Sequence, residues 1–142
     1  MLEKNFCTIM TRSIKEAGGW AYKIPDVGMS LKPFDITGVY KGKALGLELK
    51  WIQKPQAFNL QRWETHQVEN LLEVWKSGGW AALIIGIDWS RNDKRIYFWK
   101  NEELIGLKQR RDERRNILKK EFEALTYILM KNQKIDIDRL IL

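Results

Sequence analysis

Residues 44–51 alternate between large apolar side chains and small or charged ones, and this pattern constrains the fold more than any other part of the chain. The large apolar positions are Leu45, Leu47, Leu49 and Trp51. A period of two is typical of a β-strand with one buried face. Apolar residues also precede the glycine-containing turn 41–43, so the stretch 34–51 predicts a β-hairpin.

The turn determines which residues of the hairpin face each other. Gly42 can adopt a positive φ as the first central residue of a two-residue type II′ turn, with Lys43 as the second. This turn pairs Lys41 with Ala44. A three-residue turn would instead shift the pairing by one residue and turn every side chain of one strand to the opposite face.

The two-residue turn gathers three charged side chains on one face of the hairpin. In this register Asp35 lies opposite Lys50. Glu48 lies opposite Thr37 and shares the face of Lys50, because both occupy even-numbered positions of the same strand. Spacing alone leaves an ordinary solvated face with a cross-strand ion pair as an equal alternative to a reactive site.

Composition predicts one compact domain with an anionic partner. The chain has 142 residues and is 44% hydrophobic, which predicts a single domain over 1–142, with a catalytic core over 1–100 and a helical C-terminal extension over 101–142. The formal charge of +7 and the pI near 9.5 favour nucleic acid over a membrane surface as the partner.

Cysteine content and hydropathy exclude several classes of protein. Cys7 is the only cysteine, so the chain cannot form an internal disulfide or a zinc site built on cysteines, and a buried structural thiol is expected. The apolar run 81–87 is far shorter than a membrane span, and the first residues lack the apolar segment of a signal peptide. We therefore expect a cytoplasmic protein without a membrane partner.

Apolar periodicity predicts alternating helices and strands. A helix over 6–17 ends at Gly18-Gly19, and a second helix around 68–75 ends at Gly78-Gly79. Strands are expected over 20–24, 34–40, 44–51, 80–87 and 95–99. This order predicts an α/β fold in which helices flank a mixed central β-sheet.

The charged face of the hairpin has the composition that phosphodiester cleavage requires. Mg²⁺ is a hard cation that binds carboxylate oxygens, with one or two supplied by the protein. Asp35 and Glu48 meet this demand as metal ligands. Lys50 projects from the same face, where its ammonium group can orient water or stabilise charge that develops on phosphate.

Two sequence blocks resemble a known nuclease family. The run 35–43, followed by 48–50, resembles the D-x-x-G-x-Y-x-G-x…E-x-K core of RecU-type Holliday junction resolvases, within the PD-(D/E)XK nuclease superfamily. A second block, 58–60 followed by 66–69, is similar to the F-x-L…HQ segment of that family. The resemblance covers roughly Glu3 to Ile87.

The resemblance implies a restriction-endonuclease-like core and a Mg²⁺-dependent endonuclease, with Mn²⁺ as a substitute metal. It also implies a homodimer that nicks four-way junctions or other branched DNA in recombination or repair. Gln67 would then be a catalytic residue that hydrogen-bonds phosphate or water, although a surface amide is the alternative. His66 is a weaker candidate for catalysis than Gln67 and is expected to contact phosphate.

In this family a carboxylate from the first helix often joins the metal site. Glu3 fits this position better than Glu16, because Glu3 lies on the same helical stripe as Phe6 and Met10. A glutamate that only interacts favourably with the helix dipole is an equal alternative. The sequence departs from the family at 25–33, where RecU proteins carry a long stalk, and this short loop puts selectivity for junctions in doubt.

The remaining predicted DNA contacts are basic side chains. Segment 108–120 holds seven Lys or Arg residues against two acids, and the apolar repeat that continues through 129 predicts an amphipathic basic C-terminal helix. The helix would lie along phosphates or assist dimerisation, and a solvated face is the alternative. The predicted DNA-binding residues are Lys32, Lys54, His66, Arg110, Arg111, Arg114 and Arg115.

The sequence therefore predicts a Mg²⁺-dependent, structure-selective DNA endonuclease, foremost a Holliday junction resolvase. Two alternatives stay open. One is another PD-(D/E)XK nuclease, which would cut flaps or linear duplex in restriction, replication or repair. The other is a basic DNA-binding module without catalytic activity.

Overall fold

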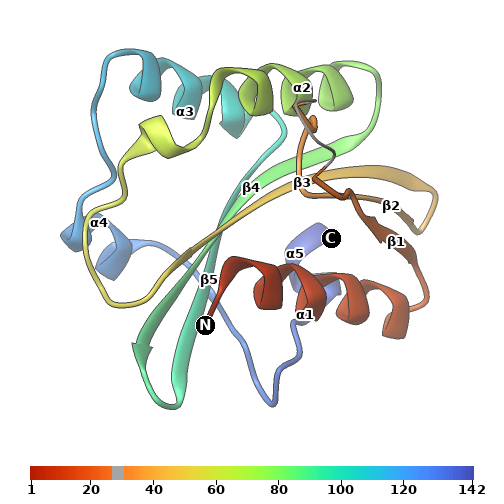
Figure 1. Ribbon diagram of the computed structural model, residues 1–142, viewed down its shortest axis with the longest axis horizontal. Helices are drawn as coiled ribbons and strands as arrows, with labels where there is room; N and C mark the ends of the chain where they lie inside the picture. Colours follow the sequence, from red (N-terminus) through yellow and green to blue (C-terminus); the bar gives the residue numbers. More distant parts are fainter. Residues whose placement is uncertain (27–30) are drawn as a thin grey trace.

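A six-stranded mixed β-sheet forms the centre of the molecule (Figure 1). The computed structural model describes residues 1–26 and 31–142. The strands follow the order of the sequence across the sheet: β1 (Trp20–Lys23), β2 (Ile36–Tyr40), β3 (Lys43–Ile52), β4 (Trp80–Ser90), β5 (Asp93–Lys100) and β6 (Ile128–Leu129). Only the β3–β4 pair is parallel. The predicted mixed sheet is therefore confirmed.

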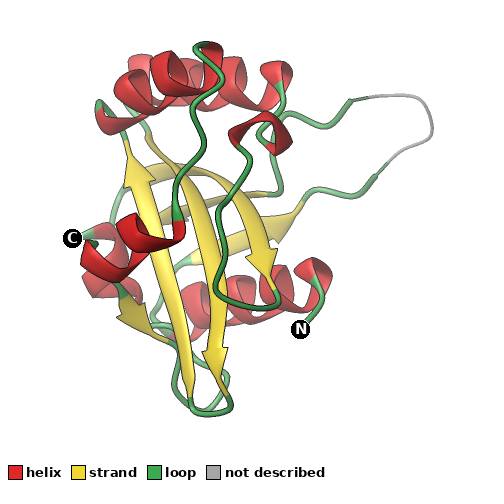
Figure 2. Cartoon of the chain, turned by 90° about the vertical axis from the view of Figure 1, so that its left-hand side faces the viewer, coloured by secondary structure: helices red, strands yellow, loops and turns green. Residues whose placement is uncertain are grey.

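Helices cover both faces of this sheet (Figures 1 and 2). One face carries α1 (Glu3–Glu16) and α5 (Ile137–Ile141), and the other carries α2 (Thr65–Lys76), α3 (Glu103–Asp112) and α4 (Lys119–Ala124). A short 3-10 helix, η1 (Leu60–Arg62), precedes α2. Among the residues that the structure describes, no helix is long and apolar enough to cross a membrane.

The period-two pattern of β3 separates two hydrophobic cores. Leu45, Leu47, Leu49 and Trp51 pack on the α1 side, in the same cluster as Phe6. The core on the other side includes the even-numbered Ile52 and the aliphatic residues of α2. Cys7 is buried on the α1 side, and burial raises its pKa to about 12, as expected for a structural thiol.

Both predicted glycine stops are confirmed. Helix α1 ends at Glu16, and Gly18 takes a φ of 97°. Helix α2 ends at Lys76, and Gly78 takes a φ of 100°. A positive φ is accessible to glycine without steric cost, so each glycine reverses the chain from a helix into a strand.

The predicted hairpin register is wrong by two residues. Tyr40 pairs with Lys43, so the central residues of the turn are Lys41 and Gly42, with φ values of 48° and 79°. Positive φ at both positions is the type I′ pattern, whose twist matches that of paired strands better than most turns. Because the shift is an even number, each side chain keeps its predicted face, but Asp35 lies next to Glu48 rather than opposite Lys50.

The predicted basic C-terminal helix is also wrong. Helix α3 ends at Asp112, and Arg114 takes a left-handed φ of 58°. Ile117 then forms a β-bridge with Phe58, with N···O distances of 2.8 and 3.1 Å in the two hydrogen bonds. This long-range contact draws the chain away from the helix, so the basic segment is not one continuous helix, and segment 101–142 contains three short helices and the edge strand β6.

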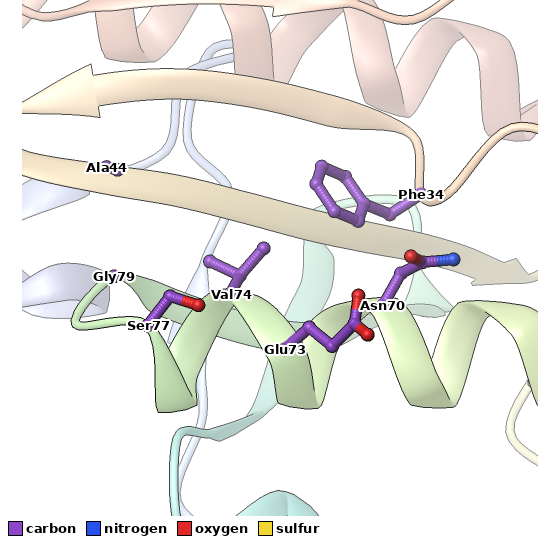
Figure 3. A pocket seen from close by; sticks show the side chains of 7 residues that line it. All are labelled: Phe34, Ala44, Asn70, Glu73, Val74, Ser77 and Gly79. Carbon is purple, nitrogen blue, oxygen red and sulfur yellow. The ribbon is translucent and has the colours of Figure 1, made fainter.

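A groove of about 350 Å³ lies between α2 and the β2–β3 hairpin (Figure 3). Phe34 and Val74 approach each other above Gly46, and a Cβ added at Gly46 would lie 3.0 Å from the Phe34 ring and 3.1 Å from the Val74 side chain. A side chain at position 46 would therefore crowd Phe34, the residue before Asp35, and Val74 where they pack on the sheet.

We expect Gly46→Ala to lower the free energy of unfolding by about 1–3 kcal/mol, the usual cost of overpacking a filled site. Gly106→Ala in α3 is the matched control, because nothing lies within 4 Å of a Cβ at that position. Alanine should stabilise this helix by about 0.5–1 kcal/mol. Urea unfolding of both variants measures the difference, and equal midpoints would contradict the packing argument.

Candidate active site

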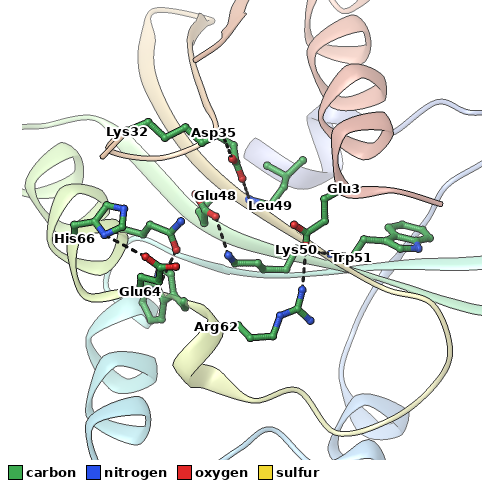
Figure 4. A network of polar contacts seen from close by, with 12 residues as sticks. Glu3, Lys32, Asp35, Glu48, Leu49, Lys50, Trp51, Arg62, Glu64 and His66 are labelled. Atoms are coloured by element: carbon green, nitrogen blue, oxygen red, sulfur yellow. Dashed lines mark hydrogen bonds and ion pairs between the residues drawn. The ribbon is translucent and has the colours of Figure 1, made fainter. Parts of the chain in front are cut away.

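The candidate site lies just before the first residue of β2, Ile36, where β3 continues beyond its pairing with β2. Asp35 N donates to Leu47 O at 2.9 Å, which is the last backbone contact between the two segments on this side. Beyond it, Leu49 N donates to Asp35 Oδ2 at 2.8 Å, and Trp51 N donates to Glu3 Oε1 at 3.1 Å (Figure 4). Two carboxylates thus satisfy backbone donors that a neighbouring strand would otherwise pair.

Glu48 is the most deeply buried charged side chain of the site. It is 2% exposed, and its Oε1 has no hydrogen-bond partner among the described residues. Lys50 Nζ lies 3.2 Å from the other oxygen, Oε2. Burial, together with the charge of Asp35, raises the pKa of Glu48 to about 8. This carboxylate therefore lacks the interactions that would compensate its burial.

Asp35 has more partners than Glu48. Besides the Leu49 amide, its Oδ1 lies 3.0 Å from Lys32 Nζ, which also lies 3.2 Å from Asp26 Oδ1. Lys32, predicted to bind DNA, therefore contacts the predicted metal ligand. The rest of loop 25–33 lies partly outside the described residues.

Glu3 lies at the edge of this site (Figure 4). Its Oε1 accepts from Arg62 at 2.8 Å in addition to the Trp51 amide. Within 1–26 and 31–142, no three acidic, histidine or cysteine side chains are close enough to form a metal-binding cluster. Asp35 and Glu48 lie close enough to interact electrostatically, whereas Glu3 is engaged with Trp51 and Arg62, so its role as a metal ligand stays a prediction.

The N-terminus of α2 faces the carboxylates (Figure 4). Gln67 is buried, and its Oε1 accepts from Glu64 N at 3.0 Å, as in a capping box. His66 Nδ1 lies 3.6 Å from Glu64 Oε2. Gln67 is therefore a buried capping residue and not a surface amide. Its catalytic role stays a prediction.

Sequence reasoning missed Arg62 and Glu64. The spacing of Glu64 and Gln67, three residues apart before an apolar helix, is a capping signal that could have located Glu64. No comparable signal exists for Arg62, because its contact with Glu3 joins positions 59 residues apart.

The predicted DNA-binding arginines are largely engaged within the protein. Arg110 donates to Glu121 at 2.7 Å, Arg111 donates to the Trp63 carbonyl, and Arg115 lies 2.9 Å from Glu113. Arg114 is exposed in the turn after α3, and Lys54 is exposed in the loop after β3. Their DNA contacts stay predictions.

Asp35 and Glu48 fit a divalent cation. Their oxygens are hard donors, and a Mg²⁺ site often takes only one or two protein carboxylates. Glu48 Oε1 is a buried acceptor that accepts no hydrogen bond from any residue that the structure describes, so it is available to a cation. Lys50 holds the other oxygen and limits the local negative charge.

Comparison with known proteins identifies the family. The family model described as Recombination protein U matches residues 30–141. The chain belongs to the RecU family. This match continues past Ile87, so the C-terminal segment, for which the sequence suggested no alignment, belongs to the same family pattern.

Curated relatives have the same family name. The Holliday junction resolvase RecU of Bacillus subtilis (strain 168) is 31% identical over 97 residues, which cover 66% of this chain and 44% of the relative. That of Bacillus licheniformis is 33% identical over 84 residues, or 56% of this chain and 42% of the relative. The chain thus spans less than half the length of these relatives.

A solved structure resembles the chain more distantly. The match is to Hjc of Archaeoglobus fulgidus, a Holliday junction resolvase from an archaeal hyperthermophile, at 20% identity and a TM-score of 0.45. It covers 73% of this chain and 92% of that one.

We expect Glu48→Gln to stabilise the protein in EDTA, because the substitution removes an uncompensated buried charge. Folding raises the pKa of Glu48 from 4.5 to about 8, so the folded state binds the proton more tightly than the unfolded one. The wild type should therefore lose stability as pH rises from about 4.5 to about 8, by on the order of 1–3 kcal/mol relative to the variant.

Urea unfolding at the two ends of this pH window measures the difference. Glu69→Gln is the matched control, since Glu69 is an exposed carboxylate of α2. A Glu48→Gln variant that is less stable than the wild type near pH 8 would show that Glu48 is compensated in the folded state.

Proposed function

We propose that this chain is a divalent-metal-dependent endonuclease that cuts branched DNA, foremost four-way junctions. The observation that carries the proposal is the buried pair of Asp35 and Glu48, with a free Glu48 oxygen and Lys50 beside it. Membership in the RecU family and relatives named Holliday junction resolvases support the substrate. The proposal applies the activity of longer relatives to a shorter chain.

Asp35 and Glu48 would hold the metal, with Mg²⁺ as the expected ion and Mn²⁺ as a substitute. When bound, such an ion activates water and neutralises charge on the phosphate. The Leu49 amide fixes the Asp35 carboxylate, and Lys32 balances its charge. Both contacts orient the carboxylate before DNA arrives.

Lys50 would act on the reacting phosphate. Its ammonium group is held 3.2 Å from Glu48 Oε2 and is largely buried, so its orientation is defined before substrate binds. A preorganised cation in a site with little water stabilises developing negative charge more strongly than a solvated one. We assign Gln67 to hydrogen-bond the phosphate through its amide NH₂, because its carbonyl already accepts from Glu64.

We further propose that the nuclease acts in the cytoplasm as a homodimer. A four-way junction presents two equivalent strands, and a dimer with twofold symmetry supplies two equivalent sites for them. The short loop 25–33 has less reach than the stalk expected of RecU proteins, so the preference for junctions over linear duplex should be smaller. Glu3 would support the site at its edge through the Trp51 amide.

Asp35→Asn and Glu48→Gln should each abolish cleavage while leaving DNA binding intact or stronger, because each removes a ligand charge and its repulsion with phosphate. The test uses labelled four-way junction, flap and linear duplex with Mg²⁺ or EDTA, and Glu69→Gln serves as control. Cleavage by either variant at the wild-type rate would refute the metal site. Mg²⁺-dependent cutting of all three DNAs alike would indicate a general nuclease.

Lys50→Ala should lower the single-turnover cleavage rate by an amount equivalent to about 2–4 kcal/mol in the barrier, the usual effect of losing one preorganised electrostatic group. DNA affinity should change little, because Lys50 is largely buried. Lys76→Ala, at the exposed end of α2, is the control. A variant that only binds DNA more weakly would make Lys50 a phosphate contact.

A further inference from the structure

The surplus positive charge of the chain lies elsewhere than the predicted basic helix. The net charge is +7, yet Arg110, Arg111 and Arg115 are engaged with Glu121, the Trp63 carbonyl and Glu113. An arginine in such a contact must lose it before it can bind a phosphate. The surface that attracts an anionic partner should therefore be sought among lysines and arginines without acidic neighbours.

Three adjoining hollows that run from α1 to the turn between β4 and β5 form a mostly basic surface, which we call the α1 trough. Their volumes are about 310, 250 and 500 Å³. Thr8 and Arg12 line both the first and the second hollow, and Met1 and Gln133 line both the second and the third. The first and third share no residue, so the hollows lie in a row.

Basic side chains line each of the three hollows, and most of them lie in the first and the third. Among the described residues, the lining contains six Lys or Arg side chains and no Asp or Glu. The six are Lys15, Lys23, Arg12, Arg91, Lys94 and Lys131. Hydroxyl and amide side chains lie between them, and both groups are the usual donors to phosphate oxygens in protein–DNA contacts.

Most of these charges are available to a ligand. Arg12 is engaged, because it donates to the Gln133 carbonyl at 2.7 Å and lies 4.0 Å from Glu16, and Lys94 lies 3.7 Å from Asp88. Within residues 1–26 and 31–142, Lys15, Lys23 and Lys131 make no ion pair and are exposed. Their mutual repulsion is relieved only by counterions or by an anionic partner.

The α1 trough and the candidate active site belong to opposite faces of the sheet. Helix α1 packs against the odd-numbered side chains of β3, whereas Glu48 and Lys50 project from the even-numbered face that α2 covers. A DNA duplex bound at the carboxylates and a duplex lying along α1 would therefore contact different sides of the protein. A branched DNA offers two such duplexes in one molecule.

We propose that the α1 trough binds the phosphate backbone of a second arm of branched DNA, other than the arm at the carboxylates. The proposal rests on the proposed function for its substrate. Its support is the row of hollows, the basic lining with its three exposed lysines that make no ion pair among the described residues, and the position of the trough on the α1 side. The trough would contribute to affinity and to the preference for branched DNA, while cleavage chemistry stays at the other face.

The test replaces the three unpaired lysines together, as Lys15→Gln, Lys23→Gln and Lys131→Gln. The matched control removes the same charge elsewhere, as Lys76→Gln, Lys119→Gln and Lys120→Gln, all of which are exposed. A third variant with arginine at the three trough positions keeps the charge. Binding of a four-way junction and of a linear duplex made from one of its arms is measured over a range of salt concentrations, in an Asp35→Asn background so that DNA is not cut.

For the trough variant we expect weaker junction binding and a salt slope reduced by about 2–3, at about 0.9 for each lost duplex phosphate contact. Linear duplex binding should fall less, and the arginine variant should bind as the parent does. If the salt slope of the trough variant equals that of the charge-matched control, the α1 trough does not bind phosphate. If the trough variant loses equal affinity for the junction and for the linear duplex, the trough does not bind a second arm.

Failure of the proposed function is distinguishable from failure of the trough. Wild-type protein that neither binds nor cuts the junction with Mg²⁺ refutes the nuclease, and the trough proposal with it. Wild-type protein that cuts the junction while the trough variant binds it like the control refutes the trough alone. Unfolding midpoints of the three variants must match the parent, because a folding defect would lower binding to both DNAs.

Discussion

Everything at the site depends on β3 extending past the end of β2. Where the neighbouring strand is missing, the amides of Leu49 and Trp51 donate to the carboxylates of Asp35 and Glu3. These two contacts satisfy the backbone donors of β3 beyond the pairing with β2, and they also fix the positions of two acidic side chains. On its other side β3 stays paired with β4 through Ile52, so the strand is held in the sheet while its free edge carries the polar groups.

The same strand also forces a carboxylate into the protein. Glu48 lies on the face covered by α2, next to Leu83 of β4, and its Oε1 has no hydrogen-bond partner among the described residues. An interaction with Lys50 compensates only part of that burial. The arrangement costs stability in the absence of a ligand, and such a cost at a buried polar site indicates function more strongly than exposed charges do.

Alternation in β3 could be read from the sequence, because side-chain faces follow from a period of two. The prediction that Asp35, Glu48 and Lys50 share a face survived an error of two residues in the register. The turn type was not predictable in the same way, since Lys41 occupies a left-handed conformation that glycine or asparagine usually takes. The local sequence pattern was thus sufficient to predict which face of the hairpin each side chain occupies. It was not sufficient to predict which residues of the two strands pair.

Long-range contacts account for the parts that sequence reasoning could not place. The bridge between Phe58 and Ile117 prevents the basic segment from continuing as a helix. Glu121 and Glu113 form ion pairs with Arg110 and Arg115, which the charge of the segment alone had assigned to DNA binding. Charge runs along a sequence do not show which charges are paired in space. The free lysines lie instead on α1, β1 and the turn before α5, three segments that become one basic surface only after the sheet has formed.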